Sequence, residues 1–164
     1  MTAVLADGSA SPPTRDTFVC DNLPLAATLP HFNLESPRYS YPERLNAAAV
    51  LIDTAIADGH GTRTAIINDC GSWTYAELGD LAARIAGLIE TEGLVPGSRV
   101  LLRGPNTATL IACWLGAIRA GCVAVTTVPL LRGPDLAPIV TRASPLLALI
   151  DARTVAAMGG VEWI

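Results

Sequence analysis

The distribution of apolar residues predicts alternating strands and helices over most of the chain. A T-x-x-E pattern at Thr74 and Glu77 predicts a capping box, followed by a helix that ends near Gly93. Three mainly apolar, β-branched-rich or leucine-rich runs, at residues 100–102, 123–128 and 146–150, predict strands that are covered on both faces. The apolar positions of the helix recur at three- and four-residue spacing: Leu78, Leu81, Ile85, Leu88 and Ile89.

Turn and cap residues indicate where the other elements begin and end. Asn46 is the expected N-cap, and Gly59 the expected end, of a helix over residues 46–58. The segments RTAIIND and WTY, with a turn between them, predict a small β-hairpin. Asn106 is expected to cap a helix over residues 107–120. Pro134 lies in the first turn of a helix expected over residues 133–143.

This order of elements predicts an α/β fold. Strands that alternate with helices pair in parallel through right-handed crossovers. The expected architecture is a partial doubly wound, mostly parallel sheet with flanking helices, together with a small N-terminal β-hairpin. Residues 1–40 are expected to form a leader and surface wrap, partly disordered, and residues 41–164 an α/β subdomain.

The charged residues narrow the range of partners. The chain has 164 residues, a net charge of −4 and eleven basic residues, all of which are Arg. The arginines do not cluster along the sequence, so we expect no nucleic-acid partner. Without Lys, neither a Schiff base nor a phosphate-binding ammonium group is available.

The most hydrophobic stretch, Thr107–Leu131, is long enough to raise the question of a membrane span. Arg119, Gly121 and Pro129 interrupt it, so it predicts a helix followed by a strand. The N-terminus has no basic start followed by an apolar block, which a secretory signal requires. We therefore expect a cytoplasmic chain with no membrane span.

Few side chains suggest chemistry. The four cysteines have no C-x-x-C spacing, and Cys113 and Cys122, within apolar runs, are expected to be buried free thiols. There is no G-x-S-x-G elbow, and His31 and His60 lie in the leader and in a loop. We therefore expect no catalytic residue and no metal site in this chain.

One loop has the general form of an anion site. The segment LLRGPNTATL combines a strand, a glycine-containing loop and a helix N-terminus, with Arg103 beside them. It contains neither G-x-G-x-x-G nor G-x-x-x-x-G-K-[ST]. We therefore interpret it as an ordinary strand–helix connection.

Three segments, in this order and spacing, resemble the N-terminal region of the adenylate-forming acyl-CoA synthetases, also called AMP-dependent synthetases and ligases. They are WTYAELGDLAARIAGLI, GLVPGSRVLLRGPNTATLIACWLGAIRAGCVAV and LLRGPDLAPIVTRASPLLALID. The resemblance covers about residues 40–151. The preceding LPHFNLESPRYSYPERLNAAAVLID looks most like aryl-CoA ligases of the benzoate and 2-aminobenzoate type.

The resemblance implies a two-step ligase reaction. A carboxylate attacks ATP to give an acyl-adenylate and pyrophosphate, and coenzyme A then displaces AMP to form a thioester, with Mg²⁺ accompanying the ATP. The chain lacks the family's phosphate loop of form YTSGTTGxPKG, its Tyr- and Glu-containing motif, its ribose-binding Asp and its C-terminal Lys. We therefore expect a truncated N-terminal fragment that is inactive alone and binds no cofactor by itself.

The resemblance also implies one cofactor contact. In the family, basic residues after the strand that matches CVAVTTV approach the coenzyme A nucleotide, which makes Arg132 the candidate cofactor-binding residue. Leu130 stands where an Arg is common, and a surface Arg before a helix is the alternative explanation of Arg132.

Two kinds of function remain open. As a fragment, the chain would act on a carboxylic acid substrate only if the rest of the enzyme were supplied, and its exposed sheet edge would favour self-association. The alternative is an independent small α/β module that binds a nucleotide or a protein without catalysis.

Overall fold

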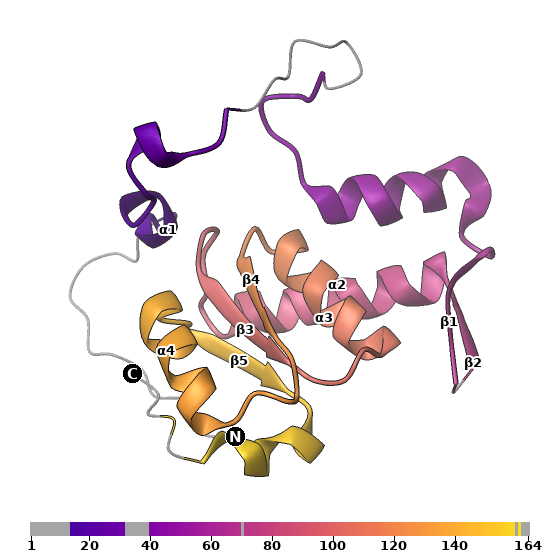
Figure 1. Cartoon of the computed structure of the whole chain (residues 1–164). Coiled ribbons are helices and arrows are strands. Elements are labelled where there is room, and N and C mark those ends of the chain that lie inside the picture. Colours follow the sequence, from indigo (N-terminus) through magenta and orange to yellow (C-terminus); the bar gives the residue numbers. More distant parts are fainter. Residues whose placement is uncertain (1–13, 32–39, 70, 160, 162–164) are drawn as a thin grey trace.

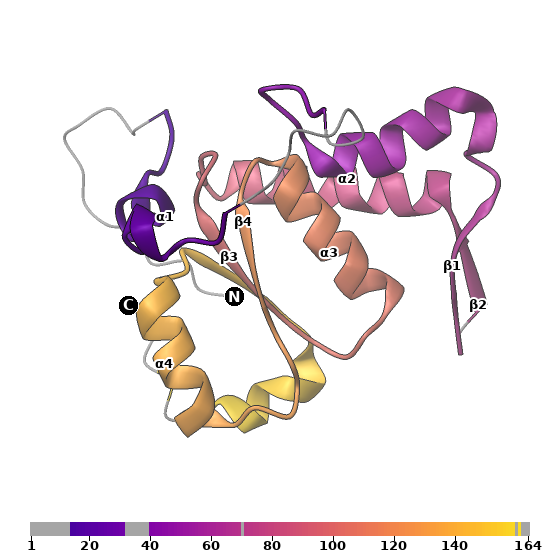
Figure 2. The same cartoon turned by 45° about the horizontal axis from the view of Figure 1, so that its top comes forward.

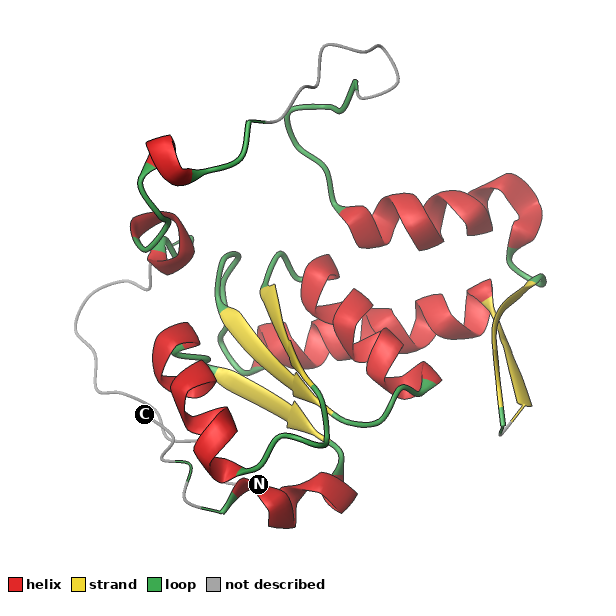
Figure 3. Ribbon diagram, viewed as in Figure 1, coloured by secondary structure: helices red, strands yellow, loops and turns green. Residues whose placement is uncertain are grey.

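The computed structural model describes residues 14–31, 40–69, 71–159 and 161. Its centre is a sheet of three parallel strands in the order β4-β3-β5 (Figures 1 and 3). The strands are β3 (Arg99–Arg103), β4 (Val123–Thr127) and β5 (Leu147–Ile150). Both pairings with β3 are parallel, so the predicted α/β fold with a parallel sheet is confirmed.

The predicted hairpin and capping box are also confirmed. Strands β1 (Thr64–Asn68) and β2 (Gly71–Thr74) pair antiparallel at the start of helix α2 (Tyr75–Thr91), away from the parallel sheet (Figure 2). The Glu77 N–H donates to Thr74 Oγ1 at 3.2 Å, and the Thr74 N–H donates to Glu77 Oε2 at 2.8 Å. These two bonds satisfy amides that the first helical turn leaves without intrahelical partners.

The first residue of helix α3 (Ala108–Arg119) differs from the prediction. Thr107, not Asn106, is the N-cap, because its Oγ1 accepts the N–H of Leu110 at 3.2 Å. Thr107 has the extended backbone that aims a cap side chain at the third helical amide. Helix α4 (Gly133–Ala143) begins and ends where predicted.

Helices α2 and α3 pack closely through small residues. The buried stripe of α2 includes Ala82 and Ala86, whereas Leu88 is 41% exposed, so the prediction that Leu88 faces the core was wrong. A Cβ at Gly116 of α3 would lie 2.7 Å from Ile85 Cγ2 of α2. Alanines and a glycine therefore form part of the contact between the two helices, because the backbones approach each other closely.

The two faces of the sheet have separate cores. Val100 and Leu102 of β3 pack with residues of α2 and α3, while Leu101 packs with Leu136 and Val140 of α4. Successive side chains of a strand point to opposite faces, so α3 and α4 cover opposite faces of the sheet. Figures 1 and 3 show this arrangement.

Only the central strand of the described sheet is fully buried. Every residue of β3 is buried, but β4 and β5 are largely half-buried. Side chains of β4 and β5 pack in the cores on both faces, as predicted, but the two strands remain partly exposed because each lies at an edge of the described sheet.

A helix of residues 47–60 precedes the hairpin and is π-helical over Ala49–Asp53 (η3) and Ile56–His60 (η4). Asn46 caps it as predicted, since Oδ1 accepts the N–H of Ala48 at 3.1 Å. The Asn46 amide also donates to the carbonyls of Ile118 and Arg119, both at 3.1 Å, and so ties this helix to the end of α3. Gly59 has φ 83° and lies one residue before the end of the helix.

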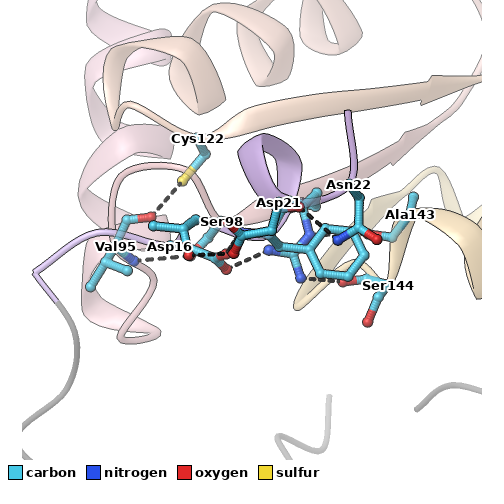
Figure 4. A network of polar contacts seen from close by, with 11 residues as sticks. Asp16, Asp21, Asn22, Val95, Ser98, Cys122, Ala143 and Ser144 are labelled. Atoms are coloured by element: carbon cyan, nitrogen blue, oxygen red, sulfur yellow. Dashed lines mark hydrogen bonds and ion pairs between the residues drawn. The ribbon is translucent and has the colours of Figure 1, made fainter. Parts of the chain in front are cut away.

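Residues 14–22, part of the expected leader, are fastened to the sheet (Figure 4). Helix α1 (Phe18–Asp21) presents the ring of Phe18, whose centroid lies 4.1 Å from the Arg99 guanidinium. Arg99 also forms an ion pair with Asp16 and donates to the carbonyls of Ala143 (3.0 Å) and Ser144 (2.8 Å). One buried side chain thus joins the N-terminal segment, β3 and the end of α4.

Two 3₁₀ helices complete the description, η1 (Ala26–Thr28) and η5 (Ala152–Met158). No helix within the described ranges has the length and apolar character needed to cross a bilayer.

Candidate functional site

The strand order locates the place where a ligand site is expected. From β3 the chain passes through α3 to β4 on one side, and from β4 it passes through α4 to β5 on the other side of β3. The order therefore reverses between β3 and β5. In open parallel α/β sheets, ligands bind outside the carboxyl ends of the strands at such a reversal.

A cavity of about 420 Å³ lies at this point. Its wall includes Arg103 and Gly104 at the end of β3, Leu110 and Cys113 of α3, and residues 148–151 at the end of β5. Arg103 and Ile150 are register partners, and the Asp151 N–H donates to the Arg103 carbonyl at 2.8 Å. The volume is within the range of small-molecule pockets, about 300–1,000 Å³.

Arg103 does not offer its guanidinium to an anion in this cavity. The side chain is fully buried and donates to the carbonyls of Val128 (2.8 Å), Pro129 (3.0 Å) and Leu131 (2.6 Å). Its Nε is buried and has no hydrogen-bond partner in the described part of the chain. Arg103 therefore braces the β4–α4 loop, which supports the interpretation of LLRGPNTATL as a structural connection.

Two other polar side chains of the lining, Thr107 and Asp151, also have partners. The Thr107 hydroxyl caps α3, and Asp151 accepts from Arg153 N–H (2.9 Å), Nε (2.9 Å) and Nη2 (2.7 Å). The side-chain and backbone hydrogen bonds from Arg153 lower the pKa of Asp151 to about 2. Asp151 is therefore an ionised carboxylate near neutral pH and holds no proton to donate.

Arg132, the predicted cofactor-binding residue, lies outside this cavity. It occupies the N-cap position of α4, where its carbonyl accepts the N–H groups of Asp135 and Leu136. Its side chain is exposed, and the guanidinium makes no hydrogen bond or ion pair with a described residue. The preceding loop also presents Leu130, which is 89% exposed. Arg103 holds three carbonyls of this loop, so the position of Arg132 depends on Arg103.

The histidines and acidic residues of the described ranges do not gather into a metal site. His31 and His60 are exposed. Within the described ranges, no three His, Cys, Asp or Glu side chains lie close enough together to hold a metal ion.

The cysteines differ in their environments. Cys122 is buried as predicted, and burial, followed by the charges of Glu90 and Asp16, raises the pKa of its thiol. Cys113 is only half-buried because it lines the cavity, so the prediction of a buried thiol was wrong there; burial still raises the pKa of its thiol. Cys20 is exposed, and Cys70 lies outside the described residues. Neither Cys113 nor Cys122 has the lowered pKa of a nucleophilic thiol.

Sequence reasoning missed the contribution of β5 to the cavity. The apolar run that ends at Ile150 was recognised as a strand, but its position next to β3 was not specified. The available signal was the parallel arrangement itself, because parallel strands bring their carboxyl ends to one edge of a sheet.

The sequence of this chain is similar to one enzyme family and to individual members of it. A sequence model of the family described as AMP-binding enzyme matches residues 54–161. The benzoate–CoA ligase of Thauera aromatica is 34% identical over 116 residues, which cover 70% of this chain and 22% of that protein. The 3-hydroxybenzoate–CoA ligase of Aromatoleum sp. (strain CIB) is 31% identical over 109 residues, covering 66% of this chain and 21% of that protein.

The structural comparison gives the same result. The crystal structure of a benzoate CoA ligase from Burkholderia xenovorans LB400 superposes with a TM-score of 0.66 at 31% identity. The superposition covers 72% of this chain and 24% of that chain. This chain thus spans less than a quarter of the length of these relatives.

Proposed function

The chain belongs to the AMP-binding enzyme family, and from this premise we propose that it is the N-terminal portion of an AMP-forming aryl-CoA ligase. The observation that carries the proposal is the shared likeness, in sequence and in fold, to benzoate–CoA ligases at 31–34% identity. The matched region is the α/β sheet and its helices, not a peripheral extension.

The whole enzyme would activate an aromatic carboxylic acid of the benzoate or 2-aminobenzoate type. The acid would react with Mg²⁺-bound ATP to give an aryl-adenylate and pyrophosphate, and coenzyme A would then displace AMP. A cytoplasmic location follows from this proposal, because ATP and coenzyme A are available there.

This portion supplies the scaffold and not the adenylation chemistry. Holding a triphosphate requires preorganised cations or backbone amides, and the chain has no Lys and no glycine-rich phosphate loop. Arg103, the buried cation nearest the carboxyl edge of β3, is engaged by three carbonyls. We therefore expect the chain alone to form no aryl-adenylate.

Arg132 is proposed to contact a phosphate of the coenzyme A nucleotide. Its guanidinium is exposed and without a partner among described residues, and it follows a loop that Arg103 holds in place. An Arg on a backbone that is held in place loses less freedom when its guanidinium binds a phosphate than an Arg on a mobile loop.

A chimeric enzyme tests the proposal. This chain replaces the matched N-terminal region of the Burkholderia xenovorans benzoate CoA ligase, and benzoyl-CoA formation is measured with ATP, Mg²⁺ and coenzyme A. We expect the chimera to form benzoyl-CoA and this chain alone to form none. A folded chimera that activates no aromatic acid would contradict the proposal.

The same chimera tests Arg132. Arg132→Ala should raise the KM for coenzyme A about tenfold, the equivalent of one lost charged hydrogen bond, and leave the KM for benzoate unchanged. Arg142→Ala, an exposed Arg in the last turn of the same helix, is the matched control and should change neither value. Equal effects of the two substitutions would refute the assigned role.

A further inference from the structure

A second cavity, of about 580 Å³, lies at the amino ends of the parallel strands. Part of its lining comes from the turns that lead into β3 and β4: Pro96, Gly97, Gly121 and Val123. The N-terminal segment of residues 14–20 supplies another part. The candidate functional site lies at the carboxyl ends of the strands, so the two cavities are at opposite ends of the sheet.

Two arginines without partners line this second cavity. Arg15 comes from the N-terminal segment and Arg44 from the chain that leads into the helix of residues 47–60, and both side chains are exposed. Neither guanidinium makes a hydrogen bond or ion pair with a described residue. Carboxylates pair instead with other arginines of the described ranges: Arg84, Arg99, Arg119 and Arg153. Like charges that share a cavity repel each other, and a bound anion offsets that repulsion.

Asp16, the acidic residue of the lining, does not neutralise these two charges. Its Oδ1 accepts the N–H of Phe18 at 2.9 Å, and its Oδ2 pairs with the Arg99 guanidinium (Figure 4). Among the described residues that line it, the cavity therefore keeps two uncompensated positive charges. The chain as a whole has a net charge of −4, so this is a local excess of positive charge.

Both arginines are attached to backbone that the fold holds in place. The N–H of Asp16, next to Arg15, donates to the Pro96 carbonyl at 2.8 Å. Asn46, two residues after Arg44, donates to two carbonyls at the end of α3, both at 3.1 Å. A side chain on a fixed backbone loses less freedom when it binds a ligand. The cavity is therefore partly organised before any anion enters it.

The hydrogen bonds around the cavity favour a carboxylate over a phosphate. Phosphate sites commonly use free backbone N–H groups. Here the N–H of Gly97 donates to the Gly121 carbonyl (2.8 Å), that of Gly121 to Ile118 (2.9 Å) and that of Val123 to Ser98 (2.8 Å). Recognition is therefore left to the two guanidinium groups, whose planar arrangement of donors matches a planar carboxylate.

We propose that this cavity is a binding site for a small organic carboxylate with an apolar body. Arg15 and Arg44 donate to the carboxylate, whose two oxygens accept about four hydrogen bonds together. The apolar body lies against Val19, Pro96 and Val123. The cavity and the candidate functional site are at opposite ends of the sheet, so this inference goes beyond the proposed function and does not depend on it.

An NMR titration tests the site, with hexanoate as the probe. Hexanoate is added to the ¹⁵N-labelled chain at low ionic strength, and the amide resonances are followed. The amides of Val19, Gly97 and Gly121 should shift with one Kd of about 1 mM, whereas that of Ile66 in the hairpin should not. Hexanamide, which has the same body without the charge, and inorganic phosphate should each bind at least tenfold more weakly than hexanoate.

Substitutions identify the groups that bind the carboxylate. Arg15→Gln and Arg44→Gln should each raise the Kd for hexanoate at least tenfold, the equivalent of one lost charged hydrogen bond. Both side chains are exposed and unpaired, so the urea transition should stay unchanged. Arg142→Gln is the matched control, because Arg142 is an exposed Arg of α4 outside the cavity. Added sodium chloride should weaken binding, since salt screens exposed charges.

Three results would overturn the proposal. Without saturable shifts at the cavity there is no site, and equal weakening by all three substitutions would mean non-specific attraction. Hexanamide binding as tightly as hexanoate would show that the arginines do not recognise the carboxylate, and equally tight phosphate binding would refute the choice of anion. The benzoyl-CoA assay of the chimera measures none of these quantities, so failure of this inference is distinguishable from failure of the proposed function.

Discussion

Arg99 and Asp16, 83 residues apart in sequence, form an ion pair that fixes the N-terminal segment against the first strand of the parallel sheet. Their side chains are 5% and 16% exposed, so little solvent screens the pair. The pair Arg84–Asp80 on α2 provides a contrast, with side chains 69% and 70% exposed. A buried guanidinium that loses its carboxylate is left as an unpaired charge, whereas an exposed one is solvated by water.

Asp16→Ala should lower the free energy of unfolding by about 3 kcal/mol, the usual effect of breaking a buried pair. The reason is that Arg99 would keep its charge in a buried position with only the Ala143 and Ser144 carbonyls and the Phe18 ring around it. Urea denaturation measures the difference. Asp80→Ala is the control and should cost less than about 1 kcal/mol; similar losses for the two variants would show that the Arg99 pair adds no special stability.

Gly97→Ala should destabilise the same region by roughly 1–3 kcal/mol. Gly97 has φ +92°, and a Cβ there would lie 2.1 Å from the Asp16 carbonyl oxygen, so the N-terminal segment would have to move. Gly87→Ala is the control: it lies within α2 with no atom within 4 Å of the added Cβ, and it should stabilise the helix by about 1 kcal/mol. Thermal unfolding of both variants checks the opposite signs, and a Gly97→Ala chain as stable as the parent would refute the close approach.

Arg103→Lys should loosen the β4–α4 loop despite keeping the charge. A lysine ammonium cannot reproduce the planar arrangement that reaches the carbonyls of Val128, Pro129 and Leu131, so we expect a loss of about 2–4 kcal/mol. Hydrogen exchange of the Leu131 and Asp135 amides should also accelerate, because both donate to carbonyls within this loop. Arg84→Lys on the surface of α2 is the control; unchanged exchange in Arg103→Lys would contradict the bracing role.

Acid should lower the free energy of unfolding through the carboxylates that cap the N-terminal ends of two helices, Glu77 at α2 and Asp151 at η5. Hydrogen bonds from Thr74 to Glu77 lower the Glu77 pKa from 4.5, and those from Arg153 bring the Asp151 pKa from 3.8 to about 2. Both pKa values are lower in the folded state, so the stability each group contributes is present above its unfolded pKa and is lost as pH falls through the folded pKa. For Asp151 the loss falls between pH 3.8 and about 2.

Carboxyl ¹³C NMR titration measures the pKa values of Glu77 and Asp151 directly. Arg153→Gln should raise the pKa of Asp151 toward 3.8 and leave the pKa of Glu77 unchanged. An Asp151 midpoint near 3.8 in the unsubstituted chain would refute the pairing with Arg153.

Local signals in the sequence were enough for most of the fold. The capping box at Thr74, the Asn46 cap and the bounds of α4 depend on neighbouring residues, which the sequence displays directly. Burial of Leu88 and of strands β4 and β5 could not be predicted in this way, because it depends on how closely α2 and α3 approach and on which strands lie at the edges.

The candidate site also depends on contacts between residues that are distant in sequence, which local patterns do not predict. The β3–α3 loop was recognised from its pattern, but the cavity exists because β5 pairs with β3 and brings Ile150 beside Arg103. The carbonyls that Arg103 binds lie 25–28 residues away in sequence, and no local pattern indicates them. The bond between Asp16 and Arg99 is a similar case.

Calorimetric titration of Mg-ATP into the purified chain tests the central claim most directly, namely that this portion is scaffold without triphosphate-binding groups of its own. The account predicts no saturable heat up to millimolar ATP, with the chain shown to be folded by its urea transition in the same buffer. Saturable binding in the micromolar range, abolished by unfolding, would contradict it.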